Sequence, residues 1–140
     1  MIEELLESWI RCSALELRWT LEERDDEVVV NLEGADGPLV LARHAEVLNA
    51  MEYLCNRASE KRGKRVFLDC NGYRAVRTEE LKLMALTAAE KVKRLGRPHQ
   101  FSPMSPEERR IIHLAVADDP LIRTESEGVG ENRKVVILPR

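Results

Sequence analysis

The amino-acid sequence predicts an α+β fold built from two small domains, over residues 1–71 and 72–140. Helical spacing of apolar residues alternates with strand-like stretches in both halves, as is typical of this fold class. Asn71-Gly72 is a turn signal and marks the boundary between the halves. Charge divides there too: residues 1–71 hold 9 Lys and Arg against 15 Asp and Glu, a net charge of −6, and residues 72–140 hold 13 against 10, a net charge of +3.

In the first half, apolar residues recur first at helical spacing and then in alternation. Gly34, Gly37 and Pro38 break the chain before a further helix, which is expected to stop near Gly63. The inward face of that helix is expected to carry Leu48, Met51, Leu54, Cys55 and Ala58. The other expected elements are a helix over 2–12 and strands over 14–23, 27–34 and 65–70.

The second half begins with a long helix that ends at Gly96. Its inward face is expected to carry Leu81, Met84, Ala85, Ala88, Val92 and Leu95. The next helix has a well-specified start, because Ser105 suits the N-cap, Pro106 suits the first helical position and Glu108 is placed for a capping box. This helix is expected to end at 118–120, and strands are expected over 99–103, 122–126 and 134–138.

The composition is that of a globular protein of the cytoplasm. The longest apolar runs are four or five residues, which is too short to cross a membrane, and the N-terminus is acidic where a secretion signal would be basic. Cys12, Cys55 and Cys70 lie far apart and form no C-x-x-C pair. We expect all three to be small buried hydrophobic residues in a reducing compartment.

No catalytic or metal site emerges from the sequence. His44, His99 and His113 lack metal-ligand spacing, and no cysteine or carboxylate completes a set. No serine or cysteine nucleophile has a base placed near it, so we expect neither an enzyme nor a cofactor. Aromatic residues are scarce, and packing is the favoured interpretation for Tyr73 and Phe101, the two candidates for stacking on a base.

Arg109 and His113 are the strongest candidates for ligand binding. They are four residues apart on the capped helix and therefore project from one face, one turn apart. An arginine fork beside a histidine donor can hold a phosphate, and the histidine contact strengthens on protonation. The alternative is a solvated pair in which His113 packs beside Ile112 and Val116.

Residues 106–140, PEERRIIHLAVADDPLIRTESEGVGENRKVVILPR, strongly resemble the single-stranded nucleic-acid-binding module named for its Arg-x-x-x-His signature. The match includes Arg109, His113, residues 126–128 and Arg133. Residues 64–81, KRVFLDCNGYRAVRTEEL, resemble the link between that module and a preceding KH domain. Both features occur in this order in the bacterial Jag family, the sporulation stage III J-associated proteins.

This resemblance implies a type II KH domain (α-β-β-α-α-β) over 1–71, followed by a small Arg-x-x-x-His α/β domain over 72–140. The segment VLNAMEYL sets the register, so the G-x-x-G loop of a KH domain falls on Ala42, Arg43, His44 and Ala45. Both glycines are replaced by alanine, which favours helix by about 1 kcal/mol per residue and would let the loop tighten into helix. Jag-family proteins usually carry a further small domain before the KH domain, and this chain starts at the KH domain's own first helix.

The resulting hypothesis is a bacterial protein that binds single-stranded RNA, with single-stranded DNA as the less favoured ligand. Arg109 and His113 would hold phosphates, Arg110 and Arg133 would add charge, and Arg43 with His44 would make weaker contacts. The resemblance also implies post-transcriptional regulation and a small single-KH partner protein. The alternative is a protein-interaction module whose KH domain has lost RNA binding, which the net charge of −6 on the first half supports.

Overall fold

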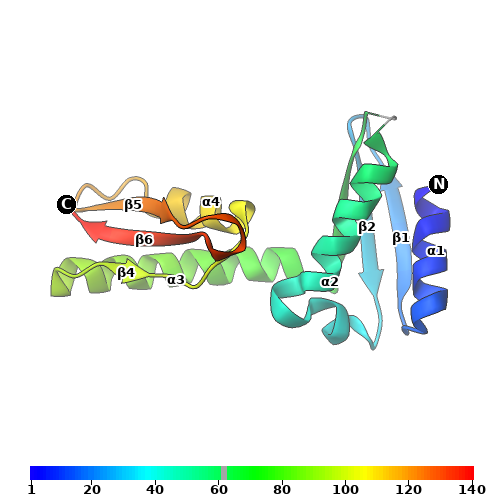
Figure 1. Cartoon of the computed structure of the whole chain (residues 1–140), viewed down its shortest axis with the longest axis horizontal. Helices are drawn as coiled ribbons and strands as arrows, with labels where there is room; N and C mark the ends of the chain where they lie inside the picture. The colour runs from blue at the N-terminus through cyan, green and yellow to red at the C-terminus, as the bar shows by residue number, and fades with distance from the viewer. Residues whose placement is uncertain (61–62) are drawn as a thin grey trace. The chain divides into compact units, whose positions relative to one another are not determined.

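The computed structural model describes residues 1–60 and 63–140 and divides into two compact units, Met1–Arg74 and Ala75–Arg140. Each unit combines helices with a three-stranded sheet, which confirms the α+β class (Figure 1). Asn71 and Gly72 lie in the turn that follows the last strand of the first unit. In the described part of the chain, no helix has the length and apolar character needed to cross a membrane.

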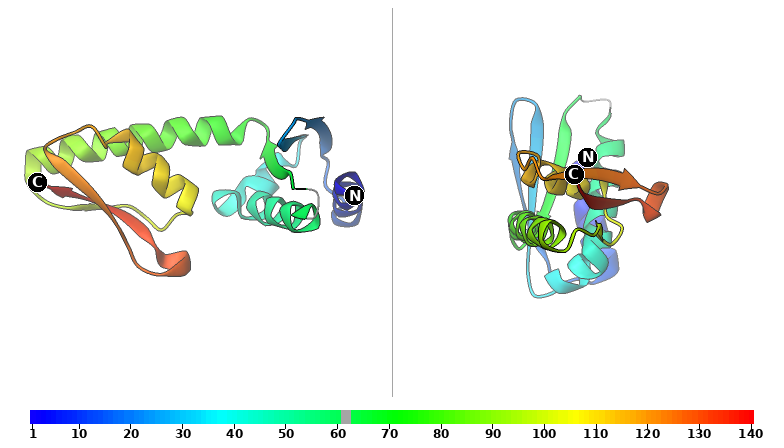
Figure 2. Two further views of the ribbon diagram at one scale, coloured as in Figure 1. Left: turned by 90° about the horizontal axis from the view of Figure 1, so that it is seen from above. Right: turned by 90° about the vertical axis from the view of Figure 1, so that its left-hand side faces the viewer.

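The first unit has its two helices on one side of its sheet (Figure 2). Strand β2 pairs antiparallel with β1 and parallel with β3, which gives the order β1-β2-β3. The elements are α1 (Ile2–Ser13), β1 (Arg18–Glu23), β2 (Glu27–Glu33), α2 (Gly37–Ala58) and β3 (Arg65–Cys70). Alternate residues of β2 and β3 are buried against the helices, and the facing pairs are Val28 with Val66, Val30 with Leu68 and Leu32 with Cys70.

Several details of the first unit differ from expectation. Strand β1 begins at Arg18 rather than at residue 14, because Ala14 ends α1 in the left-handed conformation (φ 56°). Helix α2 ends at Ala58, before the expected stop near Gly63, and residues 61–62 lie outside the described part of the chain. Leu54 is 47% exposed rather than inward-facing.

The cysteines also divide differently from the prediction. Cys55 and Cys70 are buried, and burial raises the pKa of both thiols. Cys12 is exposed on α1, so the expectation of three buried cysteines was wrong at this residue.

Helix α2 is interrupted at residues 42–45, where we expected a loop free to tighten into helix. Ala42 is extended (φ −59°, ψ 152°), and Arg43, His44 and Ala45 are all left-handed, with φ of 55°, 57° and 60°. Each left-handed residue other than glycine costs roughly 1–2 kcal/mol. The expectation was wrong because tertiary packing opposes it: Ala45 is completely buried in the core of the first unit.

The second unit places two helices and an antiparallel sheet around its own core. Its elements are α3 (Tyr73–Leu95, whose first two residues belong to the first unit), β4 (His99–Gln100), α4 (Pro106–Ala115), β5 (Ile122–Glu127), the short 3-10 helix η2 (Gly130–Asn132) and β6 (Lys134–Pro139). The strand order is β4-β6-β5. Leu81, Ala85 and Val92 of α3 are buried with Ile112 of α4 and Ile137 of β6. Met84 and Leu95 are exposed, which contradicts their predicted inward position.

Candidate nucleic-acid interface

Helix α4 begins as its sequence predicts, but one of its capping residues has another partner. Ser105 Oγ accepts a hydrogen bond from the backbone N–H of Glu108 at 3.2 Å, and Pro106 occupies the first helical position. The carboxylate of Glu108, which we expected to complete a capping box, accepts from Nε and Nη2 of Arg77 at 3.3 and 3.2 Å. These two side chains are only 15% and 16% exposed, so their ion pair fixes the start of α4 against α3.

Arg109 is anchored at the turn that leads into α4. It is half-buried, and its Nε donates to the carbonyl oxygen of Met104 at 3.2 Å. The backbone N–H of Met104 in turn donates to the carbonyl oxygen of Arg133 at 3.3 Å. Arg109 and Arg133 are therefore connected through a single residue, although 24 positions separate them in the chain (133 − 109).

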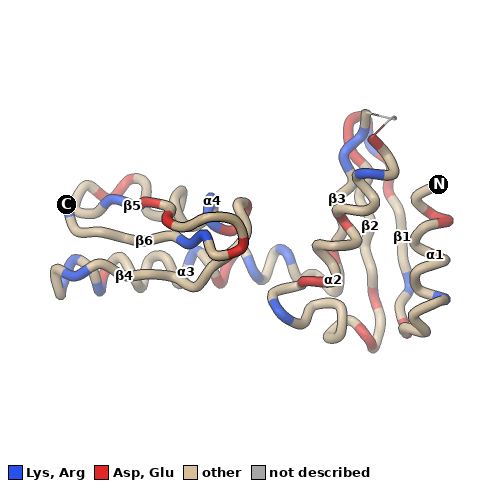
Figure 3. Tube along the Cα trace, viewed as in Figure 1, with Lys and Arg blue, Asp and Glu red and all other residues tan. Residues whose placement is uncertain are grey.

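Arg133 is held by the tight turn between β5 and β6. Its Nη1 donates to the carbonyl oxygen of Gly128 at 2.8 Å. Gly128 has φ of 94°, and a Cβ atom there would lie 2.8 Å from the carbonyl oxygen of Asn132, so this position requires glycine. Figure 3 shows basic segments on α4 and at the start of β6, where Arg110 is exposed and Lys134 follows Arg133.

His113 bridges α4 and β5. Its Nδ1 lies 2.6 Å from Oγ1 of Thr124, and its Nε2 lies 3.0 Å from Oγ of Ser126. Burial, with a smaller effect of the positive charge of Arg109, lowers the pKa of His113 below its ordinary value. The imidazole is therefore neutral near pH 7, and both of its nitrogens already have hydroxyl partners.

This arrangement can bind phosphates but offers no surface for stacking bases. Guanidinium groups form two parallel hydrogen bonds to phosphate oxygens, and Arg109, Arg110 and Arg133 provide three of them. Phe101 is the one Phe, Trp or Tyr between residues 75 and 140 in the sequence, and it is buried. Tyr73 is half-buried against the core of the first unit, so packing is the role of both aromatic candidates.

The sequence did not single out Thr124 as a site residue and indicated Ser126 only as part of the matched segment. Their spacing of two residues on a predicted strand was the available signal, because it places both hydroxyls on one face. The carbonyl oxygens of Met104 and Gly128 could not be found in this way, because backbone partners leave no residue pattern. Arg43 and His44 belong to the interrupted helix of the first unit, where both are exposed and Arg43 lies 4.0 Å from Glu46.

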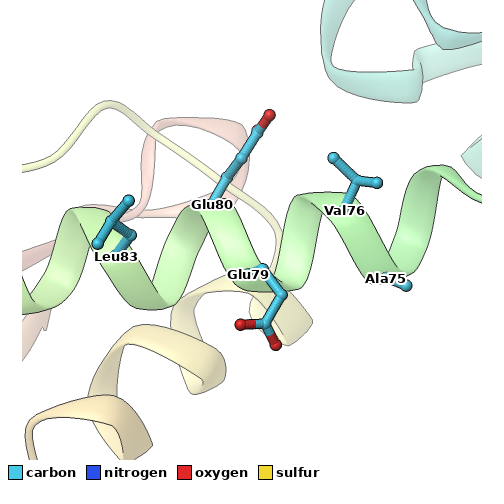
Figure 4. Close-up of a pocket in the computed structure, with 5 residues that line it drawn as sticks. All are labelled: Ala75, Val76, Glu79, Glu80 and Leu83. Carbon is cyan, nitrogen blue, oxygen red and sulfur yellow. The ribbon is translucent and has the colours of Figure 1, made fainter.

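A shallow pocket along α3 is a poor alternative site for an anion. Figure 4 shows the residues that line it, which are Ala75, Val76, Glu79, Glu80 and Leu83. Two carboxylates and three apolar side chains offer no positive charge to a phosphate. The arginines of α4 and β6 are therefore the better candidates.

The position of Arg109 and His113 on α4, against Ser126 and Arg133, now allows comparison with known proteins. Residues 79–139 match the R-3-H domain, which is the Arg-x-x-x-His module. The match runs from α3 to β6 and includes every residue of the cluster described above. It confirms the predicted module in this part of the chain.

Three curated relatives are each named RNA-binding protein KhpB. The protein of Clostridium symbiosum is 35% identical over 127 residues, which cover 89% of this chain and 57% of the relative. The protein of Bacillus subtilis (strain 168) is 33% identical over 123 residues, which cover 84% and 59%. The protein of Streptococcus pneumoniae serotype 2 is 34% identical over 101 residues, which cover 70% and 31%.

The chain thus spans less than three-fifths of the length of these curated relatives. The similarity to two KhpB proteins extends over more than four-fifths of this chain, well beyond the match over residues 79–139. Together with the Arg-x-x-x-His domain, these relatives support the Jag-type family.

Proposed function

We propose that this chain binds single-stranded RNA through the phosphate-facing side of its second unit. The carrying observation is the chain of contacts from Arg109 to Met104 and on to Arg133, which fixes two guanidinium groups on one part of the unit. The Arg-x-x-x-His domain match and the name RNA-binding protein given to the KhpB relatives support this ligand. Arg110 adds charge, and His113 positions the surface between α4 and β5.

Contacts to phosphates explain how such a surface works without aromatic platforms. Each phosphate that an arginine neutralises releases counterions, so affinity is high at low salt and falls as salt rises. Base identity has little influence when no ring stacks on the bases. We therefore assign this unit sequence-tolerant binding, with RNA preferred to DNA, in a bacterial post-transcriptional regulator of the cytoplasm.

We also propose that the first unit is a type II KH domain whose loop contributes weakly. The support is its element order, with a loop between two helical segments at residues 42–45 and three left-handed residues in that loop. Such a backbone can approach a strand of nucleic acid closely, but the methyl of Ala42 replaces a bare glycine at its edge. A small single-KH protein is the proposed partner of this unit.

A salt titration with a labelled single-stranded oligouridine tests the ligand and the site together. Arg109→Ala should flatten the slope of log affinity against log salt concentration by about 0.7, which is the loss of one phosphate contact to a single strand. Arg123→Ala is the matched control, because Arg123 lies on β5 facing away from Thr124 and pairs with Glu125. The Arg43→Ala/His44→Ala double variant should bind almost as tightly as the wild type.

Two results would contradict this assignment. A dominant effect of the Arg43/His44 pair would transfer the grip to the first unit. If the folded wild type shows no salt-sensitive binding to RNA or to the same strand as DNA, RNA binding by this chain is wrong. The function is then that of a protein-interaction module, a role favoured by the exposed Val47, Tyr53 and Leu54 on α2.

A further inference from the structure

We propose that Ser126 donates the hydroxyl hydrogen bond to the RNA phosphate, and that His113 is a positioning residue that aims this hydroxyl. Thr124 fixes the tautomer of His113 in this arrangement. The inference rests on the proposed RNA binding and deepens it, because it gives the histidine of the Arg-x-x-x-His pair an indirect role. The contact with the ligand passes to a side chain on β5.

The two distances at His113 define the direction of its hydrogen bonds. A neutral imidazole has one N–H donor and one acceptor nitrogen. The distance of 2.6 Å between Thr124 Oγ1 and Nδ1 is short for an N–H donor and suits a hydroxyl donor. The distance of 3.0 Å between Nε2 and Ser126 Oγ is the usual one for an N–H donor. Thr124 therefore donates to Nδ1, and Nε2–H donates to Ser126.

This direction leaves the two hydroxyl hydrogens in different situations. The hydrogen of Thr124 is used by His113, whereas Ser126 accepts from His113 and keeps its own hydrogen available. Among the residues that the structure describes, Ser126 Oγ has no other hydrogen-bond partner. A half-buried hydroxyl with an unused hydrogen suits a charged oxygen acceptor, because such hydrogen bonds are the stronger ones.

Ser126 also lies toward the arginines. Helix α4 begins at the end of the unit at which β5 ends (Figures 1 and 2). Arg109 precedes His113 by one helical turn, and Ser126 follows Thr124 along β5, so both are displaced from the His113–Thr124 pair toward the same end. Gly128, whose carbonyl oxygen holds Arg133, comes two residues after Ser126. A phosphate bound by Arg109 therefore has a hydroxyl donor beside it.

Variants at Ser126 and Arg109 separate hydrogen bonding from charge. Ser126→Ala should weaken binding of the labelled oligouridine about tenfold, the loss expected for one hydrogen bond to a charged group. Its salt slope should equal that of the wild type, because a hydroxyl releases no counterion. Arg109→Ala should change the slope as well as the affinity. Thermal unfolding of each variant, followed by circular dichroism, establishes that the effects occur in folded protein.

Variants at Thr124 test the positioning role of His113. Thr124→Val removes the donor to Nδ1 at nearly constant shape and should weaken RNA binding severalfold, whereas Thr124→Ser retains a hydroxyl and should restore it. Imidazole ¹⁵N resonances of the full chain should show His113 protonated at Nε2 in the wild type and in Thr124→Ser. In Thr124→Val, the Nδ1-protonated tautomer should gain population.

Each outcome decides the inference. If Ser126→Ala binds RNA like the wild type while Arg109→Ala still flattens the slope, RNA binding stands and the role of Ser126 is wrong. A wild-type His113 protonated at Nδ1 also overturns the inference, and this measurement applies even where a variant does not fold. Absence of binding by the folded wild type refutes the proposed function itself, and the inference with it.

Discussion

At the scale of single residues, His113 and His99 both have surroundings that oppose protonation. Burial is the main cause of the lowered pKa at each, and the charges of Arg109 and Lys91 add to it at His113 and His99 respectively. His99 also meets Phe101 edge to face, with 4.8 Å between the ring centroids. Both imidazoles therefore remain neutral in the folded unit at pH values at which the unfolded chain already binds protons.

This difference makes the second unit sensitive to mild acid. Because the folded pKa of each histidine lies below the unfolded value, the unfolded chain binds more protons as pH falls through about 6.5, and the free energy of unfolding decreases. Urea unfolding between about pH 8 and about pH 5.5 should show this loss in the wild type. His113→Gln should show a smaller dependence on pH, and an unchanged dependence would contradict the assigned burial effect.

At the scale of elements, the loop at 42–45 is under conformational strain that its side chains do not relieve. Arg43 is exposed, so replacing it changes the backbone preference and little else. Arg43→Gly should raise the free energy of unfolding by up to about 1 kcal/mol, because glycine adopts the left-handed conformation without a Cβ clash. Arg43→Val should lower it by roughly 1–2 kcal/mol, because β-branched residues fit this conformation worst.

A glycine introduced within the regular part of the same helix provides the control. Ala50 is exposed and helical, so Ala50→Gly should lower the free energy of unfolding by about 1 kcal/mol. Urea denaturation of the three variants measures these changes. If Arg43→Gly is as destabilising as Ala50→Gly, the loop is helical in solution.

The elements that sequence reasoning predicted well are those set by local chemistry. The start of α4 depends on Ser105 and Pro106, and β3 coincides with an alternating apolar segment between turns. The errors have tertiary causes. Ala42 and Ala45 favour helix locally, but burial of Ala45 in the core opposes it. Glu108 prefers a capping box in isolation, but a partner from α3 competes for its carboxylate.

At the scale of the whole molecule, two separate hydrophobic cores divide the chain. The residues of one core come from the first unit and those of the other from the second, with none shared. Charge follows the same division, as the sequence predicted. The candidate site was only partly predictable: the arginines and His113 follow a spacing pattern, whereas the hydroxyls and carbonyl oxygens that hold them come from chain segments that only folding brings together.

Separate cores should lose stability separately. Leu68→Ala creates a cavity in the first core and should cost about 2–5 kcal/mol there, with loss of amide hydrogen-exchange protection confined to residues 1–74. Ile112→Ala is the matched variant for the second core and should affect residues 75–140. Equal loss of protection in both units after either substitution would contradict two independent cores.

The ion pair between Arg77 and Glu108 has an electrostatic consequence for the surface around Arg109. The segment from Glu107 to Arg110 reads as neutral, with two acidic and two basic residues in succession. Once Glu108 is paired inward with Arg77, one of the two negative charges beside Arg109 is compensated. An approaching polyanion therefore meets a helix start that is effectively more cationic than its sequence. Arg77, which lies far from the ligand-binding residues in the chain, thereby reduces the repulsion that an incoming strand would experience.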